Sequence, residues 1–556
     1  MSPSLAHKNR DSIREELSAG VDLLVVGGGI NGAGILRDAA MRGLRVGLCE
    51  KNDFGHGTSS RSSKLIHGGI RYLEHLDFGL IIESCAERAR LMRLEPDLVK
   101  PTEFLMPVYK SDRYPLWYMN IGLWMYDALA FFRNHKLHRL LNKKEALATA
   151  PRMNPEGLSG GLTYYDCRVN DARLVMNNIV SAQLHGGHAL NYMEITGVKK
   201  HNGKICGATA VDRLSGASFT IPCSLLVSAA GPWTNGFYET MEGATRDILR
   251  LTKGIHLLFT QERFPAKTAV VILSNDDRRI IFVIPWEEYT LVGTTDTDYS
   301  GSIDDVTPDQ SDVGYLLKLV NDRFPGLGLV PRDAVSAYAG LRPLLLSGGS
   351  ASAVSRKDKV LASPSGALIV GGGKLTTYRK IAEKAVNMAL KRLPAGTRQR
   401  VRGCTTARVP LIERMGHTGK TGAYGRGTHP FDAEVIEYLE TRYGKKSSEI
   451  FDIAASDPTL SQRICRELPF IFAEIIYAAR REMLVSLTDF FRLRTEIFLK
   501  ASDNGLSRAD QCARILGSEL MLGEDGIRKE ADSYRSYVTR TLSCIGRGAV
   551  CSDANP

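Results

Sequence analysis

The sequence predicts an α/β fold built on a parallel sheet, combined with an α+β unit and a C-terminal helical region. Three observations predict it. Residues 21–26, VDLLVV, form an apolar run of strand length, which suits a parallel strand buried on both faces. A glycine-rich segment and a helical segment follow directly. Two later runs, residues 224–233 and 367–386, repeat the passage from an apolar strand into glycines.

The glycine-rich segment carries a dinucleotide-binding pattern. Gly27, Gly29 and Gly32 fit G-x-G-x-x-G, and the second predicted strand, residues 45–50, ends in Glu50. The first glycine permits a tight turn, the second lets the backbone approach a diphosphate, and the third lets the helix pack closely on the strand. The acid can accept hydrogen bonds from a ribose, and the helix N-terminus attracts the anion. Together these features predict a Rossmann-like domain that binds a dinucleotide.

Composition narrows the class of protein. The chain has 556 residues, 43% hydrophobic and 24% charged, which is typical of a soluble globular protein with several domains. Its N-terminus lacks the apolar core of a signal peptide, so we expect a cytoplasmic protein whose ten cysteines are reduced. The absence of a CxxC pair disfavours structural zinc, and no metal site is predicted. A P-loop is excluded because Arg414 occupies the position of its first glycine.

The net charge of +11 favours an acidic partner. An acidic substrate, an anionic membrane surface and nucleic acid all fit this charge. The sequence contains no RNP, helix-turn-helix or zinc-finger pattern, so nucleic acid is the least favoured of the three.

Two segments favour a flavin as the dinucleotide. Small hydroxyl side chains, which can hydrogen-bond phosphates or flavin heteroatoms, are dense in residues 51–74. They are Thr58, Ser59, Ser60, Ser62 and Ser63. In residues 367–386, three glycines separate a strand from a helix. We expect the N-terminus of that helix at residues 373–377, where its dipole would stabilise negative charge on a reduced flavin.

Seven stretches give the chain a specific resemblance to a known family. They are GGGINGAG (27–34), TSSRSSKLIHGGIRYLE (58–74), YYDCRVNDARLV (164–175), AGPW (230–233), IPWEEYTLVGTTDTDY (284–299), AGLRPL (339–344) and GGKLTTYRK (372–380). In these stretches and in their order, the chain resembles the FAD-dependent, quinone-linked glycerol-3-phosphate dehydrogenases, within the D-amino-acid-oxidase-like flavoproteins. The resemblance covers residues 20–390, and residues 473–484 resemble the helical cap of the family more loosely.

The resemblance implies oxidation of sn-glycerol 3-phosphate to dihydroxyacetone phosphate. Hydride would pass from C2 to N5 of a noncovalent FAD, and electrons would then pass to a membrane quinone such as ubiquinone. A phosphate dianion is bound well by arginines, and oxidation of an alcohol needs a base. The implied catalytic residues are His256 as the general base, Lys374 and Arg71. The implied substrate-binding residues are Arg342, Arg356, Arg71 and Tyr72. The implied cofactor contacts are Gly27, Gly29, Gly32, Glu50, Thr58, Ser59, His67, Gly231, Gly373, Leu375 and Thr376.

The predicted organisation has three domains, of which the first is discontinuous. Residues 20–95, 155–235 and 345–398 are assigned to the FAD-binding domain. Residues 96–154 and 236–344 are assigned to the α+β substrate domain, which includes strand-like runs at 269–273, 279–286 and 289–295. Helical patterns dominate residues 399–556, the predicted C-terminal domain.

Residues 116–132 are rich in aromatic residues and methionine, and a basic segment, residues 133–144, follows them. Asn120 and Asp127 interrupt the apolar run, so a membrane-spanning helix is not expected. One interpretation is a core helix followed by a solvated basic face. The other is a surface helix that dips into an anionic leaflet. The resemblance favours the second, which predicts peripheral association with the inner face of a membrane.

Other functions stay open at this stage. An oxidase that reduces O₂ keeps the fold and changes the electron acceptor. A flavin amine or amino-acid oxidase is a second alternative. The pair Arg342 and Arg356 favours a phosphorylated substrate, although arginine also binds carboxylates. A third alternative is a flavin-binding sensor or a nucleic-acid-binding protein. The sequence does not determine the oligomeric state, and a homodimer is one of the open alternatives.

Overall fold

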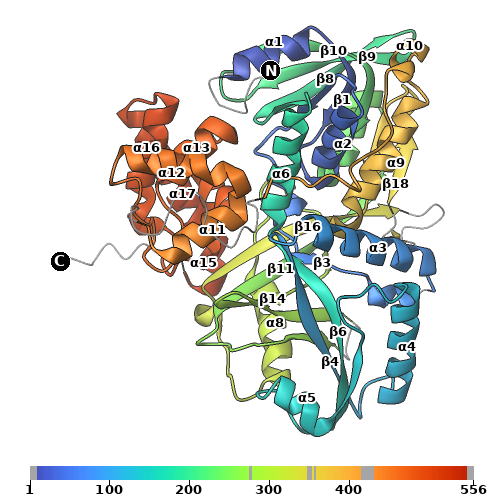
Figure 1. The fold of residues 1–556 in the computed structure, drawn as a ribbon, viewed down its shortest axis with the longest axis vertical. Helices are drawn as coiled ribbons and strands as arrows, with labels where there is room; N and C mark the ends of the chain where they lie inside the picture. Colours follow the sequence, from blue (N-terminus) through green and yellow to red (C-terminus); the bar gives the residue numbers. More distant parts are fainter. Residues whose placement is uncertain are drawn as a thin grey trace.

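The computed structural model of the protein describes residues 9–547, apart from residue 75 and residues 275–278, 347–353, 356–357 and 415–430. Figure 1 shows one sheet with its helices in the upper part of the molecule, a second sheet below it, and a group of C-terminal helices at the left. This is the predicted α/β fold with a C-terminal helical region.

The first sheet contains the two strands predicted around the glycine loop. β1 (Val21–Val26) lies between β2 (Val46–Cys49) and β10 (Ser218–Ser228) and is parallel to both. Every residue of β1 is buried, as its unbroken apolar run predicts. The other strands of this sheet are β7 (His188–Leu190), β8 (Met193–His201), β9 (Lys204–Asp212), β18 (Lys359–Ala362) and β19 (Leu368–Gly371).

Three helices pack around the start of this sheet. α2 (Ile30–Met41) follows the glycine loop and contacts both α6 (Asp171–Leu184) and α9 (Tyr378–Leu390). The contact with α9 is close: a Cβ on Gly34 would lie 3.0 Å from the ring of Tyr378. α1 (Arg10–Ser18) lies against β7 and β10.

The second sheet has eleven strands, and most of its pairs are antiparallel. The predicted strand-like runs at 269–273, 279–286 and 289–295 all contribute to it. The predicted segment 155–235 contributes one strand, β6, to this sheet and four strands to the first sheet. The strands of the second sheet are β3 (Leu65–Ile66), β4 (Val99–Tyr109), β5 (Arg139–Asn142), β6 (Leu158–Val169), β11 (Leu249–Thr260), β12 (Ala269–Leu273), β13 (Ile280–Trp286), β14 (Tyr289–Gly293), β15 (Thr297–Asp298), β16 (Ser336–Leu346) and β17 (Val354–Ser355).

Several helices flank the two sheets. α3 (Phe78–Leu94) and α4 (Leu116–Leu129) contact each other at the right-hand edge of Figure 1. The others are α5 (Lys143–Thr149), α7 (Thr234–Glu242), α8 (Gln310–Arg323) and α10 (Ala395–Gln399). Among the described residues, no helix is both long and apolar enough to cross a membrane.

The C-terminal region is helical, and the one strand-like feature in its described part is an isolated bridge between Arg463 and Ile471. A π-helical turn, η8 (Phe490–Arg494), interrupts the helices. The helices are α11 (Ala433–Tyr443), α12 (Ser447–Ser456), α13 (Ala473–Arg481), α14 (Leu487–Asp489), α15 (Ile497–Lys500), α16 (Ala509–Leu520) and α17 (Glu524–Leu542).

Buried ion pairs join the C-terminal region to the first sheet. Arg494 of η8 contacts Asp53, in the loop after β2, at 2.6 Å, and both side chains are 1% exposed. Glu482 contacts Arg494 at 3.2 Å and Arg173 of α6 at 2.5 Å. A charge buried at such a position is tolerated only when it is paired, so these contacts fix the helices against the loop.

Candidate active site

The first turn of α2 has no room for side chains. A Cβ on Gly32 would lie 1.8 Å from the carbonyl oxygen of Gly27, and one on Gly27 would lie 2.6 Å from that of Ala229. Gly27 also has a φ of +106°, which other residues rarely adopt. The backbone N–H of Gly28 donates to Oε2 of Glu50 at 2.6 Å. The predicted glycines and the predicted acid therefore form one structure, the glycine cradle, consisting of Gly27, Gly29, Gly32 and Glu50.

The hydroxyl-rich segment closes over this cradle. η2 (Thr58–Ser60) brings Oγ of Ser59 to the backbone N–H of Ile30, which donates to it at 2.9 Å. A Cβ on Gly29 would lie 3.1 Å from the same oxygen. Oγ1 of Thr58 donates to the carbonyl oxygen of Leu341, so the segment is also fixed to β16.

The helix after β19 starts at the end of the range predicted for its N-terminus, residues 373–377. Thr377 is the N-cap of α9, which begins at Tyr378 after a short 3₁₀ turn, η6 (Leu375–Thr377). Gly372 and Gly373 have left-handed φ values of 68° and 98°, and Lys374 is extended, so an α-helix cannot start earlier.

The residues between β19 and α9 contact the stretch from His67 to Tyr72, where cofactor and substrate contacts were predicted. Oγ1 of Thr376 accepts from the backbone N–H of His67 at 2.9 Å and donates to its carbonyl oxygen at 3.1 Å. Nζ of Lys374 lies 3.6 Å from the ring centroid of Tyr72 and 3.3 Å from Oγ of Ser84 on α3. The structure therefore brings four predicted residues together: His67, Tyr72, Lys374 and Thr376.

His256 lies on β11, in the second sheet, and is 2% exposed. Its Nε2 lies 2.9 Å from Oγ of Ser63, and its ring stacks on Tyr338 with 4.8 Å between centroids. Nδ1 is buried and has no hydrogen-bond partner among the described residues. Burial lowers the pKa of His256 well below its ordinary value, and the charges of Arg342 and Lys64 lower it further. The imidazole is therefore neutral near pH 7.

Neighbouring oxygen atoms hold the guanidinium group of Arg342, on β16, in one orientation. Its NH2 donates to Oγ1 of Thr294 at 2.7 Å and to the carbonyl oxygen of Thr295 at 2.9 Å. Its NH1 lies 3.1 Å from Oδ1 of Asp296. These partners fix the plane of the fork, which is what bidentate recognition of an oxyanion requires.

Some predicted residues stand apart from these groups. Gly231, in η4 (Gly231–Trp233), has a φ of +54° with open space around it. Leu375 lies half-buried in η6. Arg356 and the side chain of Arg71 lie outside the described residues.

Several residues of the site were not assigned by the sequence analysis. Ser63 stands among the hydroxyl residues of the segment 51–74, where the sequence analysis assigned it no individual role. Tyr338 stacks on His256 because the two are register partners on β11 and β16, and only the sheet register reveals this. Ser84 contacts Lys374 from α3, a contact without any local sequence signal.

The comparisons with known proteins bear directly on this arrangement. Residues 22–379 match the family model described as FAD-dependent oxidoreductase, and residues 404–526 match the C-terminal domain of alpha-glycerophosphate oxidase. The aerobic glycerol-3-phosphate dehydrogenase of Staphylococcus saprophyticus is 34% identical over 95% of this chain and 96% of its own length. The chain belongs to the FAD-dependent glycerol-3-phosphate dehydrogenase family.

Other relatives agree with this assignment to the glycerol-3-phosphate dehydrogenase family. The Staphylococcus epidermidis enzyme of the same name is 35% identical over 88% of this chain and 90% of its own. The crystal structure of the glycerol-3-phosphate dehydrogenase from Bacillus halodurans, complexed with FAD, matches with a TM-score of 0.76 at 30% identity, covering 97% of this chain and 98% of that one. The L-alpha-glycerophosphate oxidase of Mycoplasma pneumoniae, with a TM-score of 0.53 and 18% identity over 66% of this chain and 94% of its own, shares the fold.

FAD is the cofactor of the family, and the glycine cradle fits it. Oδ1 of Asn31, Oγ of Ser60 and Oγ1 of Thr377 are buried and have no hydrogen-bond partner among the described residues. Asn31 lies in the first turn of α2, Ser60 in the segment that closes over the cradle, and Thr377 at the start of α9. Three unsatisfied polar atoms around a side-chain-free turn are what a polar ligand such as a dinucleotide would satisfy.

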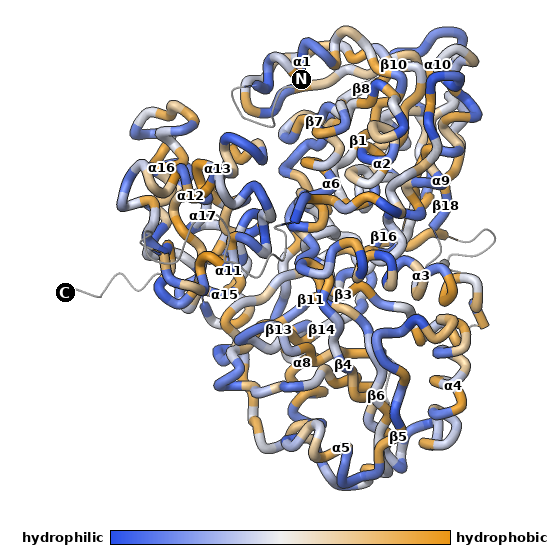
Figure 2. Tube along the Cα trace, in the orientation of Figure 1, coloured by the Kyte–Doolittle hydropathy of each residue, from blue (hydrophilic) through white to orange (hydrophobic). Residues whose placement is uncertain are grey.

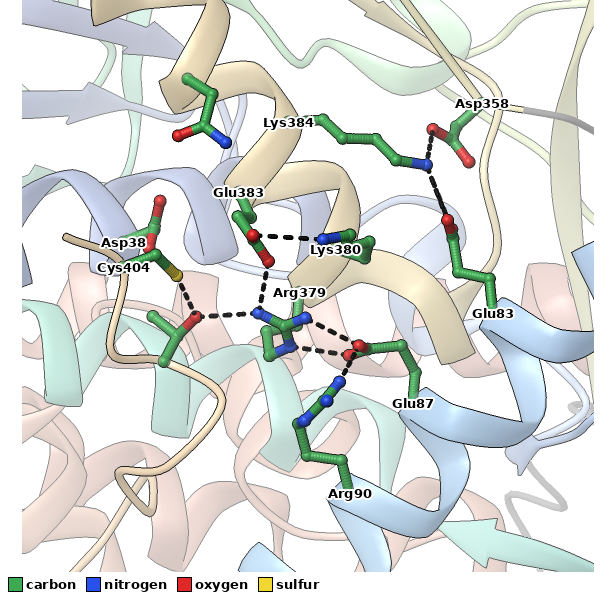
Figure 3. A network of polar contacts seen from close by, with 12 residues as sticks. Asp38, Glu83, Glu87, Arg90, Asp358, Arg379, Lys380, Glu383, Lys384 and Cys404 are labelled. Atoms are coloured by element: carbon green, nitrogen blue, oxygen red, sulfur yellow. Dashed lines mark hydrogen bonds and ion pairs between the residues drawn. The ribbon is translucent and has the colours of Figure 1, made fainter. Parts of the chain in front are cut away.

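Helix α3 fixes the segment that carries Lys374 (Figure 3). Glu87 of α3 accepts two hydrogen bonds from Arg379 of α9, both at 2.7 Å. Arg379 also contacts Glu383 at 3.0 Å. One turn away, Lys384 of α9 contacts Glu83 of α3 at 2.9 Å. The buried pair holds α3 against α9, and Nζ of Lys374, just before η6, lies 3.3 Å from Oγ of Ser84 on α3.

Arg88, the residue of α3 that follows Glu87, holds the segment around Gly68 in place. Arg88 contacts Asp166 of β6, and Oδ1 of Asp166 accepts from the backbone N–H of Gly68 at 2.9 Å. Arg88 also donates to Asn134, in the loop after α4. A Cβ on Gly68 would lie 1.9 Å from the hydroxyl of Tyr126, so the backbone approaches closely here and position 68 has no room for a side chain.

We predict that Glu87→Gln destabilises the protein much more than Glu383→Gln. Glu87 is 3% exposed, and its loss leaves the buried guanidinium of Arg379 without its main carboxylate, which costs about 3 kcal/mol. Glu383 is a partner of the same arginine at a more exposed position, where the effect is about 0.5 kcal/mol. Thermal unfolding of the FAD-loaded proteins measures the difference. Equal shifts in Tm would show that the buried pair does not hold the two helices together.

Proposed function

We propose that this protein oxidises sn-glycerol 3-phosphate to dihydroxyacetone phosphate by hydride transfer from C2 to N5 of FAD, and that a membrane quinone takes the electrons. One observation carries the proposal. Residues 63–72 contact His256 at one end, through Ser63, and Lys374 at the other, through Tyr72. A candidate base and a candidate cation are thus held by one segment that also adjoins the glycine cradle.

The substrate's phosphate is the natural partner of Arg342. A planar guanidinium binds a phosphate dianion through two parallel hydrogen bonds, and Thr294 and Asp296 already hold this one in its plane. Arg71 and Arg356 are proposed as further phosphate ligands, on the resemblance of their motifs. The names of the relatives at 34–35% identity support the same substrate.

His256 is proposed as the general base. Its pKa is lowered by burial, so the ring holds no second proton at neutral pH and can accept one. Ser63 accepts a hydrogen bond from Nε2–H in this scheme, which leaves the lone pair of Nδ1 to take the proton of the substrate's C2 hydroxyl. Tyr338 keeps the ring plane fixed through its stacking contact.

The remaining residues bind and orient. Glu50 accepts hydrogen bonds from the ribose of the cofactor, while the backbone of the glycine cradle approaches the diphosphate. Lys374 places a positive charge beside the reacting alcohol and stabilises its developing alkoxide. When bound, FAD supplies the hydride acceptor. The other named cofactor contacts, Thr58, Ser59, His67, Gly231, Gly373, Leu375 and Thr376, are proposed to line it without a covalent bond.

An apolar face around α4 supports docking to a membrane. α4 buries only Leu123, Tyr126 and Asp127, so it is not a core helix, and Figure 2 colours much of its trace as hydrophobic. Trp117 is 65% exposed and Phe131 63%. The apolar face consists of Leu76, Phe78, Ile82, Trp117, Tyr118, Ile121, Trp124, Met125, Phe131, Phe132, Leu137 and Leu140. Soluble surfaces rarely gather so many large apolar side chains without a partner.

Basic residues border the apolar face. Exposed lysines and arginines occur at Arg133, Lys136, Arg139, Lys143 and Lys144. Apolar side chains that enter the interface, with cations that attract anionic headgroups, are the two contributions that peripheral proteins combine. An electron acceptor dissolved in the bilayer, such as ubiquinone, would meet the protein at this face. We propose peripheral binding to the inner face of a membrane.

A second candidate acceptor is O₂. Residues 404–526 match a domain described for alpha-glycerophosphate oxidase, which favours this alternative without deciding it. The two functions share the substrate and the reductive half-reaction.

We predict that anaerobic addition of sn-glycerol 3-phosphate bleaches the flavin spectrum of the purified protein. In Arg342→Ala, half-bleaching needs about a hundred times more substrate, because a charged hydrogen-bond pair worth about 3 kcal/mol is lost. Flavin that stays oxidised in the native protein would contradict the proposed substrate.

The peroxide formed per turnover separates the two candidate electron acceptors. One equivalent of peroxide in air indicates the oxidase. Little peroxide, with rapid reduction of a ubiquinone analogue, indicates the dehydrogenase.

We predict that kcat stays level as the pH falls from 8 through 6.5, the ordinary pKa of histidine, and declines only below it. The lowered pKa of His256 keeps the base unprotonated over that range, and protonation removes activity only at lower pH.

His256→Gln, with FAD still bound, should lower kcat by about a hundredfold. Unchanged turnover in this variant would remove His256 from the role of base.

We predict that Ile121→Glu together with Trp124→Glu abolishes binding to vesicles that contain anionic lipid. Two carboxylates then stand on the apolar face, where they repel the leaflet and cannot enter it. Met521→Glu is the matched control, because Met521 is 89% exposed and lies at the end of α16, in the C-terminal region at the opposite side of Figure 1. Co-sedimentation at low salt measures binding. A double variant that still sediments with the vesicles would show that the apolar face is not the docking surface.

A further inference from the structure

A buried ion pair lies next to Ser63, the hydrogen-bond partner of His256. Nζ of Lys64, the residue before β3, lies 2.6 Å from Oδ1 of Asp171, in the first turn of α6. The two side chains are 7% and 0% exposed. Apolar side chains at such positions often stabilise a protein as well as a buried ion pair does, so stability alone does not account for this pair.

Asp171 binds the residues on both sides of Ser63. Oγ of Ser62 donates to Oδ2 of Asp171 at 2.7 Å, and the backbone N–H of Ser62 donates to the same oxygen at 3.3 Å. Nζ of Lys64 is the third donor. Oγ of Ser62 also accepts from the backbone N–H of Lys64 at 2.9 Å. One carboxylate and one hydroxyl therefore fix residues 62–64 as a turn.

The backbone of this turn has a conformation that needs support. Lys64 has a φ of +56°, in the left-handed region that residues other than glycine rarely adopt. Its carbonyl oxygen accepts from the backbone N–H of Val169 at 2.9 Å, which fixes the turn to β6. A residue keeps such a conformation only where its surroundings hold it there. The ion pair with Asp171 holds the side chain of Lys64, and the contact with Val169 holds its backbone.

Both contacts of the His256 ring depend on this turn. Ser63, at its centre, places Oγ 2.9 Å from Nε2 of His256. The carbonyl oxygen of Ser62 accepts from the hydroxyl of Tyr338 at 2.8 Å, and the ring of Tyr338 stacks on that of His256. The turn that Asp171 fixes thus holds the edge of the imidazole directly and its face through Tyr338.

The charge of Lys64 also reaches His256. Nζ of Lys64 lies 5.7 Å from the ring centroid of Tyr338, on which the imidazole stacks. Burial is the main cause that lowers the pKa of His256, and the charges of Arg342 and Lys64 add to it. This electrostatic effect agrees with the placement of the ion pair beside the imidazole.

We propose that Asp171 and Lys64 are positioning residues for oxidation of the substrate, which act by fixing Ser63 and Tyr338 against His256. The inference rests on the proposed function, in which Nδ1 of His256 takes the proton of the C2 hydroxyl. Both nitrogens belong to one rigid ring, so the contact of Ser63 with Nε2 sets the direction of Nδ1. A misplacement of about 1 Å lowers the rate of such a step by up to about a hundredfold.

The test measures flavin reduction by sn-glycerol 3-phosphate in the full-length, FAD-loaded protein without oxygen. Asp171→Asn keeps the shape of the side chain and removes the charge that pairs with Lys64. Asp38→Asn is the matched control, because Asp38 of α2 forms an equally buried pair with Arg42 at 2.6 Å and has no role in the site. Each variant is also prepared together with His256→Gln. Rapid mixing gives the limiting rate constant per bound flavin and the half-saturating substrate concentration.

We expect Asp171→Asn to lower the limiting rate constant by about tenfold or more. The half-saturating concentration, which depends on Arg342, changes by less than about twofold, a split that a general loss of structure would not produce. In the His256→Gln background, Asp171→Asn has no further effect, because a residue that acts through the base cannot act once the base is gone. Asp38→Asn leaves the limiting rate constant unchanged in both backgrounds.

Ser62→Ala examines the same contact without leaving a buried charge unpaired, and it decides the question if Asp171→Asn does not fold. It removes the hydroxyl that joins Asp171 to the turn. We expect the limiting rate constant to fall by about threefold, the effect of one neutral hydrogen bond, and this loss also disappears in the His256→Gln background.

The positioning role is overturned if the folded variants of Asp171 and Ser62 reduce flavin as fast as Asp38→Asn does, or if their losses multiply with that of His256→Gln. A failure of the proposed function has a different signature. The flavin of the native protein then stays oxidised with the substrate, or His256→Gln is reduced as fast as the native protein, and the positioning role falls with it.

Discussion

Two neighbouring charges of opposite sign on α3, Glu87 and Arg88, hold the parts of the active site in place. Each is buried, and a buried charge costs several kcal/mol unless an opposite charge meets it in good geometry. Glu87 therefore requires Arg379 of α9, and Arg88 requires Asp166 of β6. Since α9 follows β19 of the first sheet and β6 belongs to the second, α3 connects the two parts of the molecule, and the candidate site lies at their junction.

The site divides its electrostatic tasks between the two sheets. Burial keeps His256 neutral, and the positive charge of Arg342 reinforces this effect without an ion pair between them. The guanidinium of Arg342 is held in one plane by Thr294, by the carbonyl oxygen of Thr295 and by Asp296, and the proposed function gives it the substrate's phosphate. The proposed base and the proposed phosphate ligand are therefore compatible as neighbours, since burial suppresses the charge of histidine and does not suppress that of arginine.

Features encoded over short stretches could be predicted from the sequence, and features set by pairing could not. The bounds of β1 and β12 and the glycine cradle follow from local apolar runs and glycine spacing. α9 begins only at the end of the range predicted for its N-terminus, because left-handed glycines and an extended Lys374 delay the helix. The stacking of Tyr338 on His256 depends on strand register. The apolar pattern of residues 116–132 left two interpretations open, because composition does not say which face of a helix is covered.

The pairing of Arg494 with Asp53 has a consequence for biosynthesis. Asp53 emerges from the ribosome early, directly after the strand that ends at Glu50, whereas Arg494 emerges more than four hundred residues later. Until then the loop behind the glycine cradle carries an uncompensated acid that resists burial. The buried contact between this loop and η8 can therefore form only after nearly the whole chain has been synthesised.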